Sequence, residues 1–274
     1  MGPLMLIGGH EEPTGEILES FARTVGDEAA IALVTTATED PEGAYRRYRE
    51  SFTRLGCAEV WHIATLERAD CSDPQGARRL REAGGIFFTG GDQLRITSLF
   101  GGTAFEDALR AASAHGAVVG GTSAGASAMS ATMLVGGAED ASARRSTVTL
   151  CPGLGLLRDA VVDQHFAQRG RINRLLAALS QNPGTLGLGI DENTAVMIFP
   201  EGRLRVLGSG TVTVLDARPA GVINASEADA EAPLAFGPVA LWVLPQGATF
   251  DLAHRQVLHT HVADGDNSQA LATR

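Results

Sequence analysis

The sequence predicts an α/β protein with a mostly parallel central sheet and helices on both faces. Short apolar runs alternate with longer amphipathic segments between residues 4 and 190. Strands that are buried on both faces are apolar throughout, and parallel strands need crossover helices between them. The 274 residues are 44% hydrophobic and include 33 glycines, which allows a substantial core and many tight strand–helix turns.

The runs that predict strands of this sheet are mostly apolar. They are Leu4–Ile7, Ala29–Thr35, Glu59–Ile63, Gly85–Thr89, Ala117–Gly121, Ala160–Val162 and Leu186–Ile190. The segments between them have the helical period. Pro41–Leu55, for example, places its apolar side chains on one face and arginine and glutamate on the other. The other predicted helices are Pro74–Ala83, Asp92–Phe100, Ala104–Ala114 and Gln168–Leu179.

After Ala195 the pattern changes to strands separated by glycine-containing turns, which is typical of hairpins. These predicted strands are Val196–Phe199, Leu204–Leu207, Thr211–Leu215 and Val239–Leu244. We expect them to extend the main sheet in antiparallel fashion within a single domain, residues 1–262, followed by a polar tail, residues 263–274.

Charge, cysteine content and hydropathy exclude several classes of protein. The net charge of −10 argues against nucleic acid as a partner. The three cysteines are widely spaced and form no C-x-x-C pair, which favours neither a disulfide framework nor a zinc site. No apolar run approaches the ~20 residues that cross a membrane, and the N-terminus lacks the pattern of a signal peptide. We therefore expect no membrane partner and a cytoplasmic location.

A serine stands in a G-x-S-x-G pattern, Gly121–Gly125, between a predicted strand and a predicted helix, Ala124–Met133. Such a serine occupies a strained turn, the nucleophile elbow, where small neighbours let backbone segments approach closely. The first amides of the helix then face Ser123 and stabilise an oxyanion. The alternative is a glycine-rich turn that only packs the helix on the sheet, since a serine without a base is inert.

His165 is the expected base, because it follows the apolar run Ala160–Val162 at the carboxyl end of a strand, where open α/β sheets hold their sites. A hydrogen-bonded structural histidine is the alternative. A third group must orient the imidazole. Asp163 faces the other side of its strand, so we expect Asp191 or Glu192, which follow the next strand, and the spacing leaves both open. The order serine, histidine, acid differs from that of α/β-hydrolases.

A second strand–turn–helix junction contains Gly90 and Gly91, whose exposed amides can supply another oxyanion donor. A simple tight turn is the alternative interpretation. His259 and His261 stand close together near the C-terminus, but no third ligand lies near them in the sequence. We interpret them as part of an exposed strand and expect no metal site.

Three arginines crowd the first turn of the predicted helix Gln168–Leu179, where positive charge opposes the helix dipole. They are Arg169, Arg171 and Arg174. Arginine matches a carboxylate bidentately, so we interpret the cluster as a carboxylate-binding site just beyond His165. A surface patch of ion pairs is the alternative.

Together these motifs resemble the cyanophycinases, which belong to a serine peptidase family that also contains the aspartyl dipeptidases. The matching segments occur in the family's order, and the resemblance covers roughly residues 4–262. They are Gly90–Gln93, Gly121–Ala126, Asp163–Phe166, Gln168–Arg171, Arg174–Leu175 and Gly189–Ala195. The run from Asp163 to Leu175 is the more specific part, because it is similar to cyanophycinases rather than to the dipeptidases.

The resemblance implies a fold like that of class I glutamine amidotransferases, a homodimer and no cofactor. It implies Ser123 as nucleophile, His165 as general base and Glu192 as orienting acid. The implied oxyanion donors are the backbone N–H groups of Gly91 and Ala124. The positions that match the family's substrate-recognition residues are Gln93, Asp163, Gln164, Arg169, Arg171 and Arg174.

The implied substrate is cyanophycin, a poly-aspartate chain that carries arginine on each side-chain carboxyl, and the implied product is the β-aspartyl-arginine dipeptide. Each repeat presents one carboxylate, which suits the arginine cluster, and one guanidinium, which suits Asp163. Two other hypotheses are a dipeptidase of the same family that acts on aspartyl or isoaspartyl peptides, and a non-catalytic binding protein on the same fold. The arginine set favours the polymer, because an extended substrate needs recognition beyond one residue.

Overall fold

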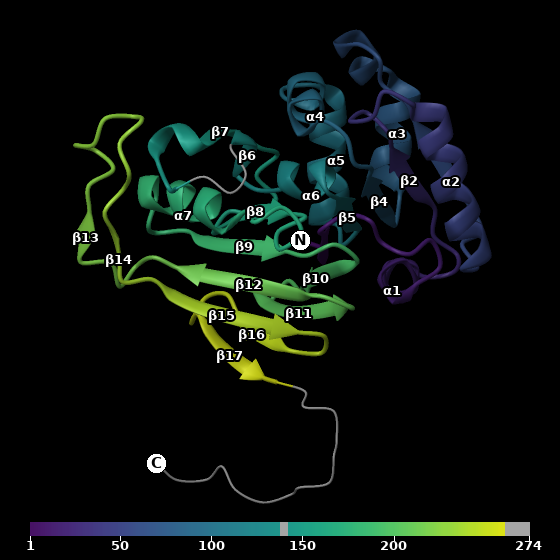
Figure 1. The fold of residues 1–274 in the computed structure, drawn as a ribbon. Coiled ribbons are helices and arrows are strands. Elements are labelled where there is room, and N and C mark those ends of the chain that lie inside the picture. Colours follow the sequence, from purple (N-terminus) through teal and green to yellow (C-terminus); the bar gives the residue numbers. More distant parts are fainter. Residues whose placement is uncertain (138–141, 261–274) are drawn as a thin grey trace, which may run out of the picture.

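The computed structural model of the chain describes residues 1–137 and 142–260. His261 and the predicted tail, residues 263–274, lie outside the described residues. Within them, a nine-stranded sheet and a four-stranded sheet carry most of the strands, and helices lie against both (Figure 1). The predicted strands are all present, with their ends shifted by up to two residues.

The nine-stranded sheet has a parallel part and an antiparallel part. In spatial order the parallel strands are β1 (Leu4–Ile7), β5 (Val118–Thr122), β4 (Gly85–Phe88), β2 (Ile31–Val34) and β3 (Val60–Ile63). On the other side of β1 follow the antiparallel strands β10 (Thr194–Ile198), β11 (Arg203–Gly208), β16 (Thr249–Asp251) and β17 (Gln256–His259). The predicted α/β class is therefore confirmed, and so is the antiparallel extension of the main sheet for the predicted strands Val196–Phe199 and Leu204–Leu207.

Helices cover both faces of the parallel part because its strands are apolar on both sides. Met5 and Ile7 of β1 pack with α1 (Glu16–Val25) and α2 (Pro41–Arg54). Leu4 and Leu6 face the other layer. The helices of that layer are α3 (Pro74–Glu82), α4 (Gln93–Phe100), α5 (Ala104–Ala114) and α6 (Ala124–Ala128).

Helix α1 is absent from the sequence prediction, although its pattern carries the signal. Ile17 and Phe21 are four residues apart and both are buried against the sheet, as the i, i+4 spacing requires. Helix α6 is shorter than predicted. It ends at Ala128 rather than Met133. Strand β6 (Thr132–Gly137) begins four residues later and pairs with β7 (Val148–Pro152), so these residues are not available to a longer helix.

The four-stranded sheet was not expected as a separate unit. In spatial order it contains β15 (Ala240–Pro245), β12 (Thr211–Asp216), β9 (Leu186–Ile190) and β8 (Ala160–Gln164). The sequence analysis placed all four of these strands in the main sheet, β8 and β9 as parallel strands and β12 and β15 as part of the antiparallel extension. That assignment was wrong, because a local sequence pattern predicts a strand but does not say which strands it pairs with.

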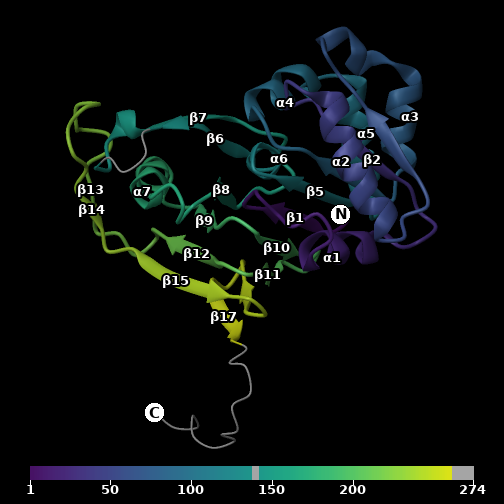
Figure 2. The ribbon, with the colours of Figure 1, turned by 45° about the vertical axis from the view of Figure 1, so that its right-hand side comes forward.

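Helix α7 (Ile172–Gln181) connects β8 to β9 and packs on this second sheet. Figures 1 and 2 show α7 and the second sheet on the side of the molecule opposite to α2–α5. Short elements complete the described chain. They are the strand pair β13 (Val222–Ile223) and β14 (Phe236–Gly237), and the 3₁₀ turns η1 (Arg68–Ser72) and η2 (Arg145–Thr147). Among the described residues, no helix combines the length and the hydropathy that a membrane span needs.

Candidate active site

Ser123 stands at the turn between β5 and α6. Its backbone has φ +51° and ψ −110°, a conformation that costs an L-residue free energy. A Cβ at Gly121 would lie 2.6 Å from the carbonyl carbon of Gly125, and one at Gly125 would lie 2.5 Å from the carbonyl oxygen of Phe88. The two glycines of the motif are therefore required by close backbone approach, as the sequence analysis predicted.

The segment that follows β1 joins the two sheets at this point. The carbonyl oxygen of Ile7 accepts a hydrogen bond from the Ser123 amide at 2.9 Å, and that of Gly8 accepts one from the His165 amide at 2.9 Å. Gly9 has φ +101°, and a Cβ there would lie 2.3 Å from Cε1 of His165. One short backbone segment thus fixes Ser123 and His165 relative to each other, although they follow strands of different sheets.

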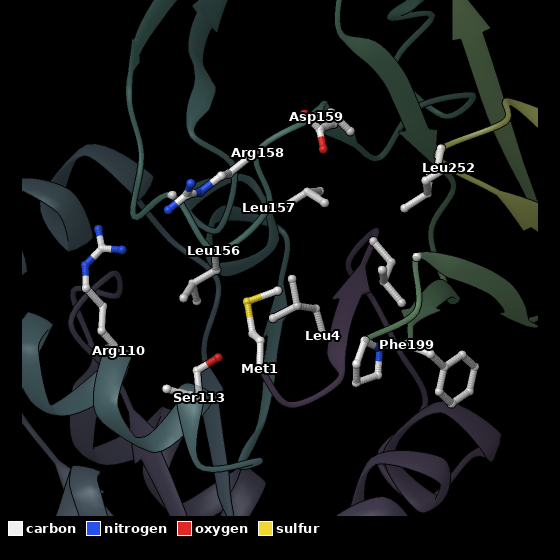
Figure 3. Close-up of a pocket in the computed structure, with 17 residues that line it drawn as sticks. Met1, Leu4, Arg110, Ser113, Leu156, Leu157, Arg158, Asp159, Phe199 and Leu252 are labelled. Atoms are coloured by element: carbon white, nitrogen blue, oxygen red, sulfur yellow. The ribbon is translucent and has the colours of Figure 1, made fainter.

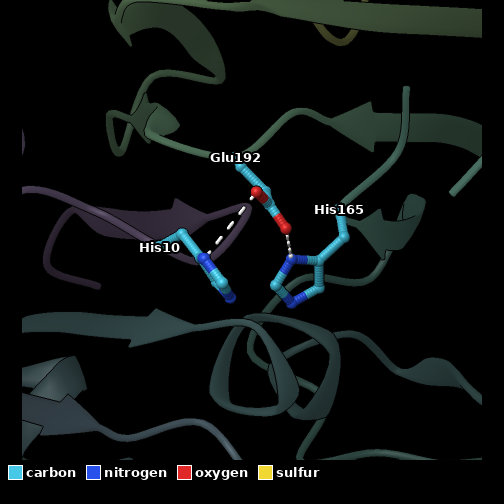
Figure 4. Close-up of side chains that lie close together, drawn as sticks. All are labelled: His10, His165 and Glu192. Atoms are coloured by element: carbon cyan, nitrogen blue, oxygen red, sulfur yellow. Dashed lines mark hydrogen bonds and ion pairs between the residues drawn. The ribbon is translucent and has the colours of Figure 1, made fainter. Parts of the chain in front are cut away.

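The imidazole of His165 lies between Ser123 and Glu192. Its Nε2 is 2.9 Å from Ser123 Oγ, and its Nδ1 is 2.7 Å from Glu192 Oε1 (Figure 4 shows the latter contact). A carboxylate only accepts, so Nδ1 carries the proton and the Ser123 hydroxyl donates to Nε2. The three side chains form a continuous hydrogen-bonded chain with the geometry of a nucleophile, a base and an orienting acid.

Burial changes the pKa of the candidate base, His165. His165 is 5% exposed, and desolvation lowers the pKa of its imidazole below the ordinary value. The hydrogen bond to Glu192 acts in the opposite direction, and the positive charge of Arg169 lowers the pKa further. At neutral pH the ring is therefore uncharged, which is the state that accepts a proton from a hydroxyl.

The two candidate acids have different partners. Glu192 reaches the imidazole, whereas the Asp191 carboxylate accepts from the Ala167 amide at 3.0 Å and from the Thr211 hydroxyl at 2.8 Å. Asp191 therefore ties the end of β9 to its neighbours, and the alternative that the spacing left open is decided geometrically in favour of Glu192.

His10 lies beside the same carboxylate. Its Nδ1 is 3.7 Å from Glu192 Oε2, and its ring meets the His165 ring edge-on with centroids 5.3 Å apart (Figure 4). The three side chains place one possible ligand atom each within 4.8 Å of one another. Since Glu192 and His165 are already bonded to each other and His10 is 71% exposed at its side chain, we interpret the group as part of a hydrolytic site.

Ser123 and His165 open into a cavity of ≈ 490 Å³, which we call the Ser123 cavity. Within the described residues, the amide N–H groups of Gly91 and Ala124 donate to no protein acceptor. Gly91 has φ +139°, and a Cβ there would lie 2.1 Å from the carbonyl oxygen of Ala37, so this turn requires glycine. Both residues adjoin the serine turn, because Ala124 follows Ser123 and a Cβ at Gly90, the residue before Gly91, would lie 3.5 Å from Cβ of Ser123. Their role as oxyanion donors stays a prediction.

The arginine cluster differs from the prediction. Helix α7 begins at Ile172, not at Gln168, because Gly170 has φ +59° and the preceding residues form turns. Arg169 and Arg171 therefore lie before the helix, and only Arg174 lies in its first turn. Arg169 is exposed and lines the Ser123 cavity.

The other two arginines point inward. Arg174 and Arg171 are each 5% exposed, and Asp163 is fully buried between them. Arg174 Nε donates to Asp163 Oδ2 at 2.9 Å, and a second bond joins its Nη2 to Oδ1. Arg171 Nη1 donates to the carbonyl oxygen of Gln164 at 2.7 Å. The guanidinium groups do bind a carboxylate, but it is a carboxylate of this chain, and the cluster is neither an open cradle nor a surface patch.

The two predicted glutamines are also held by neighbours. Gln164 is 6% exposed, and its Oε1 accepts from Ser127 Oγ at 2.8 Å. Gln93 Nε2 donates to the carbonyl oxygen of Leu134 at 2.6 Å. Among the described residues that line the Ser123 cavity, neither glutamine is present. The sequence analysis predicted the correct end of the sheets for both glutamines but not their hydrogen-bond partners.

A second cavity, of ≈ 500 Å³, lies at the opposite end of the strands, near the start of β1 and β8 (Figure 3). Met1, Leu4 and Phe199 contribute apolar side chains, and Arg110 and Asp159 contribute charged ones. Its described lining residues include no histidine or cysteine. The arrangement that supports chemistry is therefore at the Ser123 end.

Comparison with known proteins agrees with this geometry. The profile of Peptidase family S51 matches residues 4–205. The chain belongs to this family. This S51 peptidase is 38% identical over 262 residues to a cyanophycinase from Synechococcus elongatus, which covers 94% of this chain and 81% of that protein. It is 35% identical over 259 residues to a cyanophycinase from Trichormus variabilis, with 93% and 87% covered.

A solved structure supports the fold of the S51 peptidase. A peptidase from an acI-B1 actinobacterium superposes with a TM-score of 0.69 at 22% identity, covering 92% of this chain and 97% of that chain. The predictions that the chain belongs to this family and that it is a serine peptidase are therefore confirmed. Several residues that line the Ser123 cavity were missed, among them Gly9, Glu11 and Tyr48. The glycine pair after the first strand was a usable signal for Gly9, but nothing local marked the other two.

Proposed function

We propose that this S51 peptidase hydrolyses cyanophycin to β-aspartyl-arginine dipeptides, with Ser123 as nucleophile, His165 as base and Glu192 as orienting acid. The observation that carries the proposal is the hydrogen-bonded chain Ser123–His165–Glu192, with distances of 2.9 and 2.7 Å, at the edge of a cavity. The similarity to cyanophycinases over most of the chain supports the choice of substrate.

The reaction follows from the positions of the donors. Ser123 Oγ attacks the carbonyl carbon of the scissile amide while His165 Nε2 takes the hydroxyl proton. The amides of Gly91 and Ala124 donate to the carbonyl oxygen as it becomes negative. The C–N bond then breaks, and His165 returns the proton to the leaving amine. Water attacks the resulting ester and gives its proton to His165, and Ser123 departs with that proton.

Substrate recognition divides between direct and indirect contributors. Arg169 lines the Ser123 cavity and is placed to bind the carboxylate of a repeat. Asp163, Arg171 and Arg174 act by positioning, because they are buried and hold the end of β8 beside His165. Arg171→Ala is therefore expected to lower the melting temperature as well as kcat/KM, since it removes a partner from a buried carboxylate.

The test is digestion of purified cyanophycin followed by mass analysis of the products, with the Ser123→Ala protein as the inactive control. Release of β-aspartyl-arginine supports the proposal. Hydrolysis of free Asp-X dipeptides without attack on the polymer would replace it by an aspartyl dipeptidase. Inactivity on both, with Ser123 unlabelled by a serine-directed acylating reagent, would indicate a binding protein.

We infer in addition that the enzyme is a cytoplasmic homodimer of single-domain subunits without a cofactor. The resemblance to the family supports the dimer. Light scattering on the purified full-length chain tests it, and a monomeric mass at micromolar concentration would contradict it.

A further inference from the structure

Besides Ser123, His165 and Arg169, the Ser123 cavity is lined by residues of the loop after β1, of the segment between β2 and α2, and of α2 itself. Their charged and polar side chains are His10, Glu11, Thr38, Arg47 and Tyr48. We call Glu11, Thr38, Arg47 and Tyr48 the α2 wall.

Hydrogen bonds fix the carboxylate of Glu11 beside the nucleophile turn. Its Oε1 accepts from the Tyr48 hydroxyl at 2.5 Å, and its Oε2 accepts from the hydroxyl of Thr122, the residue before Ser123, at 2.6 Å. Burial is the main cause that raises the pKa of Tyr48 well above its ordinary value, so the phenol stays protonated and donates. A carboxylate has about four lone-pair sites, so Glu11 retains acceptor capacity toward the cavity.

The α2 wall continues into an adjoining cavity of ≈ 380 Å³, which shares Glu11, Arg47 and Tyr48 with the Ser123 cavity. Beyond the shared residues the adjoining cavity is lined by Glu50 and Arg54. The two cavities therefore adjoin beside helix α2. Glu50 and Arg54 are paired with each other at 2.5 Å, so Glu11 and Arg47 are the charged groups of the wall that line both cavities.

Arg47 is the cation of the α2 wall and lines both cavities. Its recorded ion pair joins Nη1 to Asp40 Oδ2 at 3.8 Å, and the two side chains are 67% and 69% exposed. Such an exposed, long contact holds the guanidinium weakly. A substrate carboxylate can therefore displace it at little cost.

From these contacts we propose that the α2 wall is a second recognition site, which binds the cyanophycin repeat next to the one at Arg169. Arg47 binds the carboxylate of that repeat and Glu11 binds its guanidinium group. The assignment rests on the proposed function, because a zwitterionic repeat presents the two charges that the wall complements.

Steady-state kinetics of the Arg47→Gln and Glu11→Gln proteins on cyanophycin test the proposal. Glutamine at position 11 can keep bonds to both hydroxyls while it loses the charge. Each variant is expected to raise KM at least about tenfold with little change in kcat, as expected for loss of one charge-assisted hydrogen bond. Arg46→Gln is the matched control, because Arg46 is exposed on the same helix and lines neither cavity.

Binding measured without turnover provides the second readout. The Ser123→Ala protein is expected to co-sediment with the polymer more tightly than the Ser123→Ala, Arg47→Gln double variant, and added salt should reduce this difference. If the wild-type enzyme releases no dipeptide from cyanophycin, the proposed function fails. If the wild type cleaves the polymer but Arg47→Gln and Arg46→Gln have equal KM and equal binding, the α2 wall is not a substrate site.

Discussion

Two histidines of this chain sit in similar hydrogen-bonded surroundings, and only one of them faces a cavity with a nucleophile. His165 Nε2 is 2.9 Å from Ser123 Oγ, and His62 Nε2 is likewise 2.9 Å from Thr35 Oγ1. A glutamate oxygen lies near Nδ1 in both, at 2.7 Å for His165 and at 3.6 Å for the pair His62–Glu42. Burial lowers the pKa of both imidazoles.

The differences lie around the hydroxyl and the carboxylate. Thr35 is 1% exposed and lies directly after β2, whereas Ser123 stands in a strained turn at the edge of the Ser123 cavity. Glu42 is 80% exposed at its side chain and makes no hydrogen bond to the ring within the described residues, whereas Glu192 is 27% exposed and is hydrogen-bonded to His165. A hydroxyl, a histidine and a glutamate near each other are therefore not sufficient. Access to a cavity and a hydrogen-bonded carboxylate separate the candidate site from a structural histidine.

The largest expected difference is in kcat, between variants that remove the hydroxyl of Ser123 and variants that remove the hydroxyl of Thr35. Ser123→Ala is expected to lower kcat on cyanophycin at least ~10³-fold, because the attacking atom is lost. Its melting temperature should stay unchanged, since alanine fits the same turn. Thr35→Ala should keep the wild-type kcat and lose about 1 kcal/mol of unfolding free energy with its hydrogen bond. Dipeptide release and thermal denaturation measure both, and an inactive but fully stable Thr35→Ala protein would refute the distinction.

The second largest expected difference in kcat is between variants of the two carboxylates, Glu192 and Glu42. Glu192→Gln is expected to lower kcat roughly 10²–10⁴-fold, because the amide no longer holds the Nδ1–H tautomer and no longer stabilises the imidazolium. Glu42→Gln should leave kcat unchanged and alter the unfolding free energy by less than about 0.5 kcal/mol, as is usual for an exposed ion pair. Single-turnover kinetics provide the readout. Comparable rates in the two variants would show that Glu192 is not the orienting acid.

The two rings are packed differently, which gives a third comparison. His62 stacks on Tyr45 with centroids 4.2 Å apart, whereas His165 fits only because Gly9 has no Cβ. Gly9→Ala should displace the imidazole and lower kcat about 10²-fold, the scale expected for a misplacement near 1 Å. Gly26→Ala is the control, because Gly26 also has positive φ, +90°, but nothing lies within 4 Å of its Cβ position. Equal kcat values for Gly9→Ala and the wild type would rule out this packing constraint.

A fourth effect is on the pH profile. Because burial lowers the His165 pKa, kcat/KM should fall on the acid side at a pH below the ordinary histidine value of ~6.5. Arg169 contributes to that lowering, so Arg169→Gln should move the acid limb to higher pH. Arg78→Gln, on an exposed face of α3, should leave the limb in place. A limb that stays fixed in Arg169→Gln would contradict the electrostatic coupling.

The smallest effect concerns stability at His62. Its folded-state pKa is lowered, mainly by burial, so the unfolded chain binds the proton more readily. The stabilisation is complete above the unfolded value of ~6.5 and is lost as pH falls from there through the lowered folded pKa. His62→Gln should therefore flatten the decrease of melting temperature in that acidic range without changing kcat. An unchanged slope would show that His62 does not contribute to it.

Local sequence patterns were sufficient to predict the turn that contains Ser123. Strand, glycines and helix follow one another within a few residues. The requirement for glycine at Gly121 comes from the backbone of Gly125, four residues away, and at Gly125 it comes from Phe88 in the adjacent strand β4. The same holds for most elements, because hydrophobic period and turn residues act over short stretches. Helix α1 was missed although its period was present.

Contacts between residues far apart in the sequence could not be predicted from local patterns. The three arginines were expected to face a substrate, but Arg171 and Arg174 turn inward to Asp163, because a buried carboxylate needs cationic partners. Likewise, Glu11 and Tyr48 lie 37 residues apart and meet only because α2 packs on the face of the sheet beside the β1 loop.

The sequence by itself determined the α/β class, the position of the serine turn and the end of the strands at which the candidate site lies. The tertiary structure decided that a strand of a second sheet delivers His165 to Ser123, 42 residues away, and that Glu192 rather than Asp191 reaches the ring. The physical reason is that propensity and periodicity are properties of neighbouring residues. The distance between two side chains on different sheets depends instead on the hydrogen bonds of Ile7 and Gly8 and on the space left at Gly9.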